Sequence, residues 1–191
     1  DVRDPGLYST EITSSADVTV RLTGSGFSGH RIDGVTVSNA GEPAADDFGA
    51  AIHLDGAVAD IQNTDIQMDG EMYYDAVDGQ TVNTTDYQPG MAGIVLSSVS
   101  SSVIDNVTIA WDTPGDTYHG LAGGTRAVGS AGVYASSSTF TLSNSSVAAG
   151  IGGGESTTWG QAGSAGVALV NGSVGTLDSN SSITGDTGTI A

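Results

Sequence analysis

The chain has 191 residues, with 22 acidic residues against four arginines, no lysine and a formal net charge of −18. Such a surface repels nucleic acid and anionic membranes, which excludes both as partners. The absence of cysteine excludes disulfides and thiolate metal sites, and no apolar run reaches the roughly 18 residues of a membrane span.

The charge also suggests the source of the protein. Aspartate outnumbers glutamate by 18 to 4, and this much like charge destabilises a compact state through self-repulsion. Salt near 1 M shortens the Debye length to about 3 Å and removes most of that repulsion. We therefore expect an extreme halophile, a haloarchaeon or its virus. An ordinary acidic secreted protein is the alternative.

Residues 1–16 lack a clear pattern, since Val2, Leu7 and Ile12 are widely spaced among polar residues. Two interpretations stay open, a lead-in strand or cap over the first repeat and a loosely ordered terminus. Residues 17–191 are predicted to form one elongated domain. The chain begins at Asp rather than Met, as expected of a mature protein or of a segment of a longer one.

From residue 17 onward a two-part motif recurs. In the first repeat, Val18, Val20 and Leu22 alternate with polar residues, as in a half-buried strand. In the second, His53 alternates with Ile52 and Leu54 and is predicted to face solvent. The five repeats span residues 17–37, 51–66, 92–109, 131–147 and 165–183.

The repeats predict an all-β fold. Their β-branched runs of three to six residues are too short for helices, and Gly, Asn and Ser interrupt them as in tight turns. Each apolar stripe is too small to be buried alone, so successive repeats must stack into a continuous core. We predict a right-handed parallel β-helix of about five coils. The last repeat carries one extra residue between Leu177 and Ile183.

An asparagine stands at the turn in the second part of most repeats. Asn tolerates the left-handed backbone of a sharp turn, and Gly34 serves the same purpose in the first repeat. Side chains at equivalent positions could share amide hydrogen bonds along the stack. This predicted asparagine ladder consists of Asn63, Asn106, Asn144 and Asn180.

The wording Ile104-Asp105-Asn106-Val107-Thr108-Ile109 resembles the repeat consensus of the pectate-lyase-like family of parallel β-helix proteins. The resemblance covers roughly residues 17–185. It implies the fold but leaves the function open, because that family includes lyases, hydrolases, adhesins and phage spikes.

The segments between repeats vary in length, and we predict that these insertions all lie at one corner of the helix. They are residues 38–50, 67–91, 110–130 and 148–164. Insertions at one position of a stacked repeat gather on one face, often the binding face. Aromatic rings there could bind a protein neighbour or a glycan, or fold the insertions back onto the sheet. The predicted binding face comprises Phe48, Tyr73, Tyr74, Tyr87, Trp111, Tyr118 and Trp159.

The resemblance also implies two enzyme chemistries. Hydrolases similar to polygalacturonases use an Arg-x-Lys motif, which a chain without lysine lacks. Lyases similar to pectate lyase use a Ca²⁺-binding acid cluster with basic residues, and of the four arginines only Arg126 lies in an insertion. Arg126 with Asp112 and Asp116 is the best constellation for such a lyase, and the nearby His119 is interpreted as a solvated residue.

Three acidic pairs offer oxygen ligands for Ca²⁺, namely Asp46 with Asp47, Asp75 with Asp78, and Asp112 with Asp116. None has the spacing of a calcium loop, so we assign no metal and no cofactor. Five Asn-x-Ser/Thr sequons are present, and three of them coincide with the predicted ladder. Asn83 and Asn171 are the better candidates for glycosylation.

The sequence therefore predicts a non-enzymatic, extracellular structural subunit of a halophile, on a cell surface, in a filament or in a virion. Its expected partners are further copies or neighbouring surface proteins, which the aromatic face or the ends of the helix would contact. A glycan-binding adhesin and a Ca²⁺-dependent polysaccharide lyase are the alternatives.

Overall fold

The computed structural model describes residues 10–14, 18–25, 29–39, 49–68, 91–111, 131–149 and 165–185. These residues contain strands and no helix, so none of them could cross a membrane as a helix. The strands are β1 (Glu11–Ser14), β2 (Val18–Thr23), β3 (His30–Asp33), β4 (Thr36–Asn39), β5 (Gly49–Asp55), β6 (Ala59–Met68), β7 (Met91–Ser97), β8 (Ser102–Trp111), β9 (Ala131–Ser136), β10 (Thr139–Ser143), β11 (Ser146–Ala148), β12 (Ala165–Val170), β13 (Val174–Leu177) and β14 (Ser182–Thr184).

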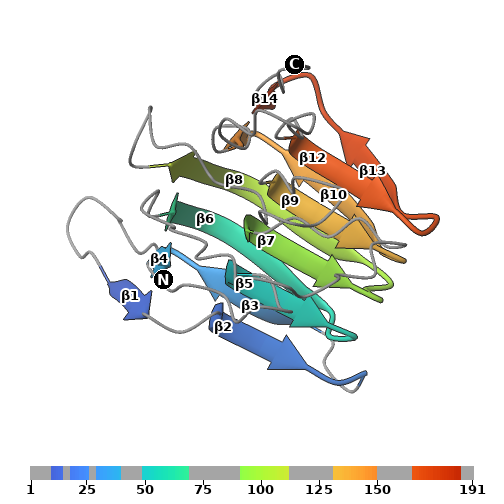
Figure 1. The fold of residues 1–191 in the computed structure, drawn as a ribbon, viewed down its shortest axis with the longest axis horizontal. Coiled ribbons are helices and arrows are strands. Elements are labelled where there is room, and N and C mark those ends of the chain that lie inside the picture. Colours follow the sequence, from blue (N-terminus) through green and yellow to red (C-terminus); the bar gives the residue numbers. More distant parts are fainter. Residues whose placement is uncertain are drawn as a thin grey trace, which may run out of the picture.

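The strands form two sheets in which all strand pairs are parallel. The five-stranded sheet has the order β12-β9-β7-β5-β2, and the nine-stranded sheet contains the remaining strands (Figure 1). The prediction of an all-β chain with parallel strands is confirmed.

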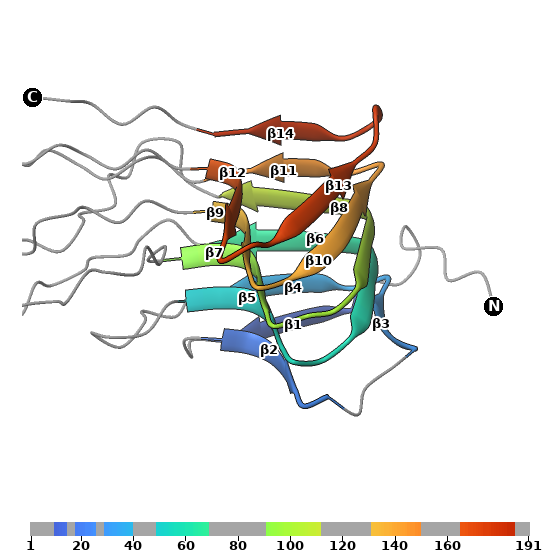
Figure 2. The ribbon, with the colours of Figure 1, turned by 90° about the vertical axis from the view of Figure 1, so that its right-hand side faces the viewer.

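Each predicted repeat contributes one strand to the five-stranded sheet and then crosses to the nine-stranded sheet. The repeats comprise β2–β4, β5–β6, β7–β8, β9–β11 and β12–β14, and they lie in this order from one end of the molecule to the other (Figure 2). Equivalent residues are register partners, as Ile52 with Ile94 and Ile94 with Val133.

Two bends recur in the described repeats. The first bend, between the two sheets, has a residue with positive φ at Gly24, Gly56, Ser98, Ser137 and Asn171. The second bend, inside the nine-stranded sheet, has one at Gly34, Asn63, Asn106 and Asn144. Asn and Gly tolerate this left-handed backbone better than other residues, which explains why they mark the second bend in the sequence.

The core lies between the two sheets and consists mainly of Ile, Leu and Val. Ile52 and Ile94 reach it from the five-stranded sheet, while Ile61, Ile66 and Ile104 reach it from the nine-stranded sheet. Each of these side chains is fully buried, and each such burial is worth about 1.5–3 kcal/mol. The alternation of buried and exposed residues along β6 and β8 is that of a strand with one face in the core.

A glycine in the first part of the motif allows close packing of the two sheets. A Cβ at Gly93 would lie 2.6 Å from Cγ2 of Ile109 and 2.9 Å from the carbonyl oxygen of Gly132. A Cβ at Gly132 would lie 2.7 Å from the carbonyl oxygens of Ala148 and Gly166. The recurring Ala-Gly-Ile or Ala-Gly-Val therefore reflects a steric requirement.

The described strands extend beyond the predicted repeat boundaries by one or two residues. Gly49 and Ala50 belong to β5, and Gln67 and Met68 belong to β6, although we assigned all four to insertions. The extra residue of the last repeat is present, because Leu142 pairs with Leu177 while Ser146 pairs with Ser182, one position further along. Within residues 1–16, β1 forms and pairs with β4.

The prediction that His53 faces solvent is wrong. His53 does point away from the core, on the same row as its register partner Val95 and then Tyr134. However, His53 is only 6% exposed and Val95 is fully buried. The outer face of the five-stranded sheet thus carries a second apolar cluster of Ala50, Ala92, Val95, Ala131 and Tyr134. Alternation gives the direction of a side chain but not whether the face it points to is covered.

Candidate functional site

The asparagines of the second bend form hydrogen-bonded chains along the stack. The Nδ2 group of Asn106 donates to Oδ1 of Asn63 at 2.8 Å, and Nδ2 of Asn63 donates to Oδ1 of Asp33 at 2.8 Å. In the later repeats, Nδ2 of Asn180 donates to Oδ1 of Asn144 at 3.2 Å. Each amide thus donates to the repeat before its own.

The ladder differs from the predicted one at the step from Asn106 to Asn144. There, Nδ2 of Asn144 donates at 2.8 Å to Oδ1 of Asp105. The ladder therefore consists of two segments, and each ends on a carboxylate, Asp33 or Asp105. The four asparagines are also exposed rather than turned inward, which leaves them on the outer surface of the bend.

Asp105 is held in its ionised form by these contacts. The hydroxyl of Ser143 donates to Oδ1 of Asp105 at 2.6 Å, beside the amide of Asn144. These two hydrogen bonds, that from Ser143 first, hold the pKa of Asp105 below its ordinary value, and slight burial opposes them.

Buried and half-buried serines connect consecutive repeats at both bends. At the first bend, the backbone N–H of Val99 donates to Oγ of Ser138 at 3.0 Å, and that of Ser138 donates to Oγ of Ser173 at 3.0 Å. At the second bend, the N–H of Val107 donates to Oγ of Ser145 at 3.1 Å. The N–H of Ser145 likewise donates to Oγ of Ser181, at 3.3 Å.

The end of the stack formed by the fifth repeat exposes apolar side chains. Leu177 is 45% exposed although its register partner Leu142 is fully buried, and Ile183 is 37% exposed although its partner Val147 is buried. Leu169 of the same repeat is exposed beside its buried partner Ala135, and Val174 is exposed on the outer face beside Thr139. We call Leu169, Val174, Leu177 and Ile183 the apolar end.

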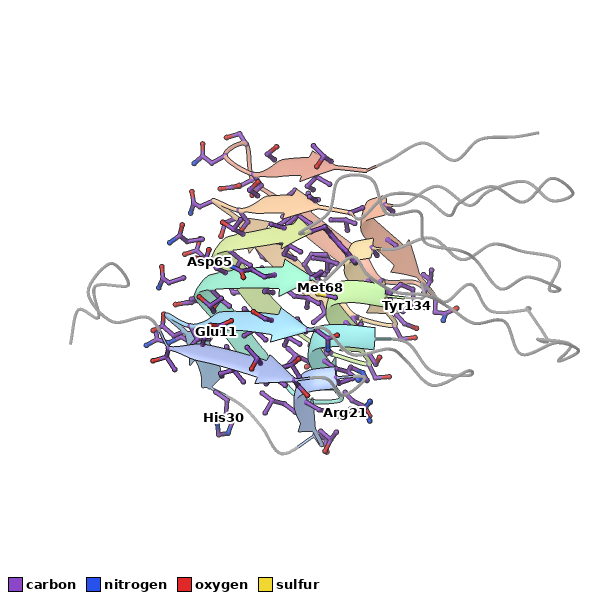
Figure 3. The ribbon with its side chains drawn as sticks, turned by 60° about the vertical axis from the view of Figure 1, so that its left-hand side comes forward. Glu11, Arg21, His30, Asp65, Met68 and Tyr134 are labelled. Carbon is purple, nitrogen blue, oxygen red and sulfur yellow. The ribbon has the colours of Figure 1, made fainter. Side chains whose placement is uncertain are left out.

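The opposite end of the stack has a different character. Arg21, His30 and Arg31 lie on β2 and β3, the edge strands of the first repeat, and Arg21 and His30 point outward there (Figure 3). Arg31 forms an ion pair with Asp33 at 3.2 Å and contacts Gln62. Val20, Leu22 and Ile32 are partly buried at this end, so its core is better covered than that of the fifth repeat.

Of the predicted aromatic face, only Trp111 lies in the described part of the chain, and its assignment to an insertion is wrong. Trp111 is the last residue of β8, packs against the core and donates from Nε1 to the carbonyl oxygen of Ala148 at 2.9 Å. The other predicted residues of this face lie outside the described residues, namely Phe48, Tyr73, Tyr74, Tyr87, Tyr118 and Trp159.

Of the two glycosylation candidates, one lies in the described part of the chain and the other lies outside it. Asn83 lies outside the described residues. Asn171 is exposed at the first bend, and its Nδ2 donates to Oγ of Ser136 at 2.9 Å. The sequon hydroxyl of Ser173 donates to the carbonyl oxygen of Val170 at 2.7 Å, so this sequon is engaged in the turn once the chain has folded.

The candidate residues for calcium and for catalysis, including Arg126 and His119, also lie outside the described residues. Within the part that the structure describes, no three His, Asp or Glu side chains are grouped as a metal site would require. Nothing in the described geometry thus brings together the acid cluster and basic group that a lyase needs.

The comparisons with known proteins identify no relative. No protein-family model, no curated protein and no solved structure matches this chain. What the described surface can do therefore follows from its own chemistry. It offers a polar ladder that is largely self-satisfied and an apolar end with unpaired strand edges.

The sequence analysis expected contacts at the ends of the helix but did not name the residues of the apolar end. Leu177 and Ile183 have the same place in the motif as residues that are buried in the other repeats. Only their position in the outermost described repeat distinguishes them, and that position follows from the order in which the repeats stack.

Proposed function

We propose that the chain is a right-handed parallel β-helix with five coils. The parallel register of successive repeats, the two recurring bends and the core between the sheets support this interpretation. Parallel strands of one sheet are joined almost always by right-handed crossovers. The resemblance of residues 104–109 to the pectate-lyase-like consensus agrees with it.

We further propose that the protein is a non-enzymatic, extracellular structural subunit of a halophile and that it assembles through the apolar end. The exposure of Leu177, Ile183, Leu169 and Val174 carries this proposal. Exposed apolar side chains beside unpaired strand edges are a template on which another chain can add.

The distribution of charge favours contact at this end. Among residues 165–185 the one ionisable side chain is Asp178, whereas the whole chain carries a net charge of −18. Most of the acidic residues lie outside the described part, which contains Glu11, Asp33, Asp55, Asp60, Asp65, Asp105 and Asp178. Among the described residues, a contact between two fifth repeats would therefore bring only two carboxylates together.

The basic residues support a non-enzymatic role. The chain has no lysine and four arginines, and Arg31 is engaged with Asp33 and Gln62. An anionic polysaccharide would be repelled by the surface as a whole. Incubation with a panel of polyuronides and Ca²⁺ should yield no unsaturated product, and release of such a product would favour the lyase instead.

Sedimentation analysis in molar KCl tests the assembly. We expect the wild-type protein to associate as its concentration rises and Leu177→Asp to remain monomeric, because a buried charge without a partner opposes association. Thr176→Asp is the matched control, since it adds the same charge to the outer face of the same strand and should still associate. A wild-type protein that is monomeric at every concentration contradicts the proposal.

The glycan-binding alternative depends on aromatic residues outside the described part, so no described contact favours it. A glycan array probed in molar KCl tests it directly. Binding that survives Leu177→Asp would assign recognition to another surface.

A further inference from the structure

We infer that the partner at the apolar end is a second copy, packed with its own fifth repeat against the first. The two copies would then be related by a two-fold axis, and assembly through this surface would close at a dimer. This inference rests on the proposed function, because it names the partner for the same surface.

The distribution of exposed apolar side chains is the first argument. Among the described residues, the exposed large hydrophobic side chains are Ile12 at one end of the stack and the four residues of the apolar end at the other. An apolar patch gains free energy when apolar atoms cover it. Within the described residues, the largest group of exposed apolar side chains that a second copy offers is its own apolar end, and a patch that contacts itself generates two-fold symmetry.

The first repeat is a poor complement to the apolar end. Its edge strands β2 and β3 carry Arg21, His30 and Arg31, and its apolar residues are partly buried already. Head-to-tail contact would place these charged side chains at the rim of an apolar surface. In addition, β1 pairs with β4 and extends only the nine-stranded sheet at this end, so the surface that a fifth repeat would meet is uneven.

The hydrogen bonds at the bends give an independent argument. In the third and fourth repeats, the N–H groups that follow the bends donate to serine hydroxyls of the next repeat. In the fifth repeat, the N–H of Ser173 donates to the carbonyl oxygen of Val170 at 3.1 Å, and that of Ser181 donates to the carbonyl oxygen of Asp178 at 3.4 Å.

One extra residue at each bend of the fifth repeat makes these local hydrogen bonds possible. At the first bend, Val170 pairs with Ser136 but Val174 pairs with Thr139, so Gly172 is additional. At the second bend, the addition lies between Leu177 and Ser182. The serine ladder therefore ends in the fifth repeat, and the apolar end presents apolar side chains without bend N–H groups that would need hydroxyls from a partner.

Asp178, the one charged group at this end, is satisfied within its own chain. Its Oδ1 accepts hydrogen bonds from the backbone N–H groups of Asn144 and Asn180 and from the hydroxyl of Ser181, at 3.3, 3.2 and 2.8 Å. Two such carboxylates, each already hydrogen-bonded, can approach a two-fold interface without needing a cation from the partner.

Pulsed electron paramagnetic resonance tests the arrangement, because a chain without cysteine accepts single spin labels at chosen sites. Thr176→Cys labels the fifth repeat, and Thr23→Cys labels the first. Strands stack about 4.8 Å apart, so the first and fifth repeats of one copy are roughly 20 Å apart. In molar KCl we expect a short distance between copies for Thr176→Cys and a distance of about 40 Å or more for Thr23→Cys.

The outcomes are distinct. Leu177→Asp in the Thr176→Cys background should abolish the short distance. Similar distances from both labels, together with species larger than a dimer, would overturn the two-fold arrangement and leave association intact. A protein that is monomeric by sedimentation and shows no distance between copies would overturn the proposed function as well.

Discussion

Two nearly identical buried serines contribute to stability in opposite ways. Ser102 is 2% exposed and Ser138 is 3% exposed. Oγ of Ser102 has no hydrogen-bond partner among the described residues. Oγ of Ser138 accepts from the N–H of Val99 and donates to the carbonyl oxygen of Ser136.

We expect Ser102→Ala to raise the free energy of unfolding by about 1 kcal/mol or leave it unchanged, since it removes a buried hydroxyl that lacks a partner. Ser138→Ala should lower it by about 1–3 kcal/mol, since it leaves the N–H of Val99 unsatisfied. Denaturant unfolding in molar KCl measures both. A larger loss for Ser102→Ala than for Ser138→Ala would contradict these hydrogen-bond assignments.

The lowered pKa of Asp105 predicts a pH dependence at low pH. Because the pKa is lower in the folded state than in the unfolded chain, the carboxylate contributes stability above the unfolded value of 3.8, and this contribution is lost as the pH falls through the folded value. Melting temperatures of the wild type and Asp105→Asn should therefore differ most above pH 3.8 and converge below it. A difference that stays constant from neutral pH into the acid range would exclude this role.

The sequence predicted the backbone conformation of single residues better than their surroundings, because the surroundings depend on other repeats. The positive φ values at Asn63, Asn106 and Asn144 agree with the turn preference of asparagine. The burial of His53 and the position of Trp111 in β8 depend instead on what lies beside them in other repeats. The choice of Asp105 over Asn106 as acceptor for Asn144 depends on side-chain geometry that no spacing reveals.

At the scale of elements, the second bend avoids placing carboxylates side by side. Register partners run from Asp33 to Gln62, Asp105 and Ser143 along the row before the bend, and Asp178 follows in the fifth repeat. Charged and neutral side chains therefore alternate, and two carboxylates of the row lie two strand spacings, about 9–10 Å, apart. The hydroxyl of Ser143, between Asp105 and Asp178, donates a hydrogen bond to Asp105 instead of adding repulsion.

Substitution of Asn106 separates the two roles of the ladder asparagines. In Asn106→Ala, alanine must adopt the left-handed backbone of φ 52°, and the hydrogen bond to Asn63 is lost. We therefore expect the free energy of unfolding to fall by about 1–3 kcal/mol. Asn106→Gly tolerates the backbone and loses only the amide, so it should cost less. Urea unfolding of the two variants tests this order, and equal costs would indicate that the left-handed backbone is not strained.

The repeat spans could be predicted because the apolar alternation of β6 and β8 directly reflects one buried face. Of the two additions in the fifth repeat, the one between Leu177 and Ile183 was also visible in the spacing, whereas Gly172 at the first bend was not predicted. The local hydrogen bonds of Ser173 and Ser181 were not predicted either, because they appear only once the bends are built.

At the scale of the whole molecule, the described strands and bends carry few of the acidic residues. Seven of the 22 acidic residues lie in the described part, among them Asp65 on the outer surface of β6. The stack itself is held by apolar packing and hydrogen bonds that salt screens little. The ends of the helix were expected to make contacts, but the exposed side chains of the apolar end were not named, because their exposure follows from the packing of the outermost described repeat.

The net charge of −18 predicts stability that depends on salt. We expect the melting temperature to rise substantially from low salt to molar KCl, because screening removes the self-repulsion of the acidic residues. Calorimetry over a KCl series measures this, with sucrose as a control that does not screen charge. Equal melting temperatures at both extremes of KCl would argue for an ordinary acidic protein.

The stacking of repeats in register underlies the fold and both proposals, and cross-linking between strands tests it most directly. Thr108 and Ser146 are exposed register partners on β8 and β11, although 38 positions separate them in sequence. In molar KCl, a short bifunctional thiol reagent should link Thr108→Cys with Ser146→Cys, and likewise Ser146→Cys with its partner Ser182→Cys. It should link Thr108→Cys with Ser182→Cys, two strands apart, far less. Equal linkage of all three pairs, or none in the two adjacent pairs, would contradict the stacked arrangement.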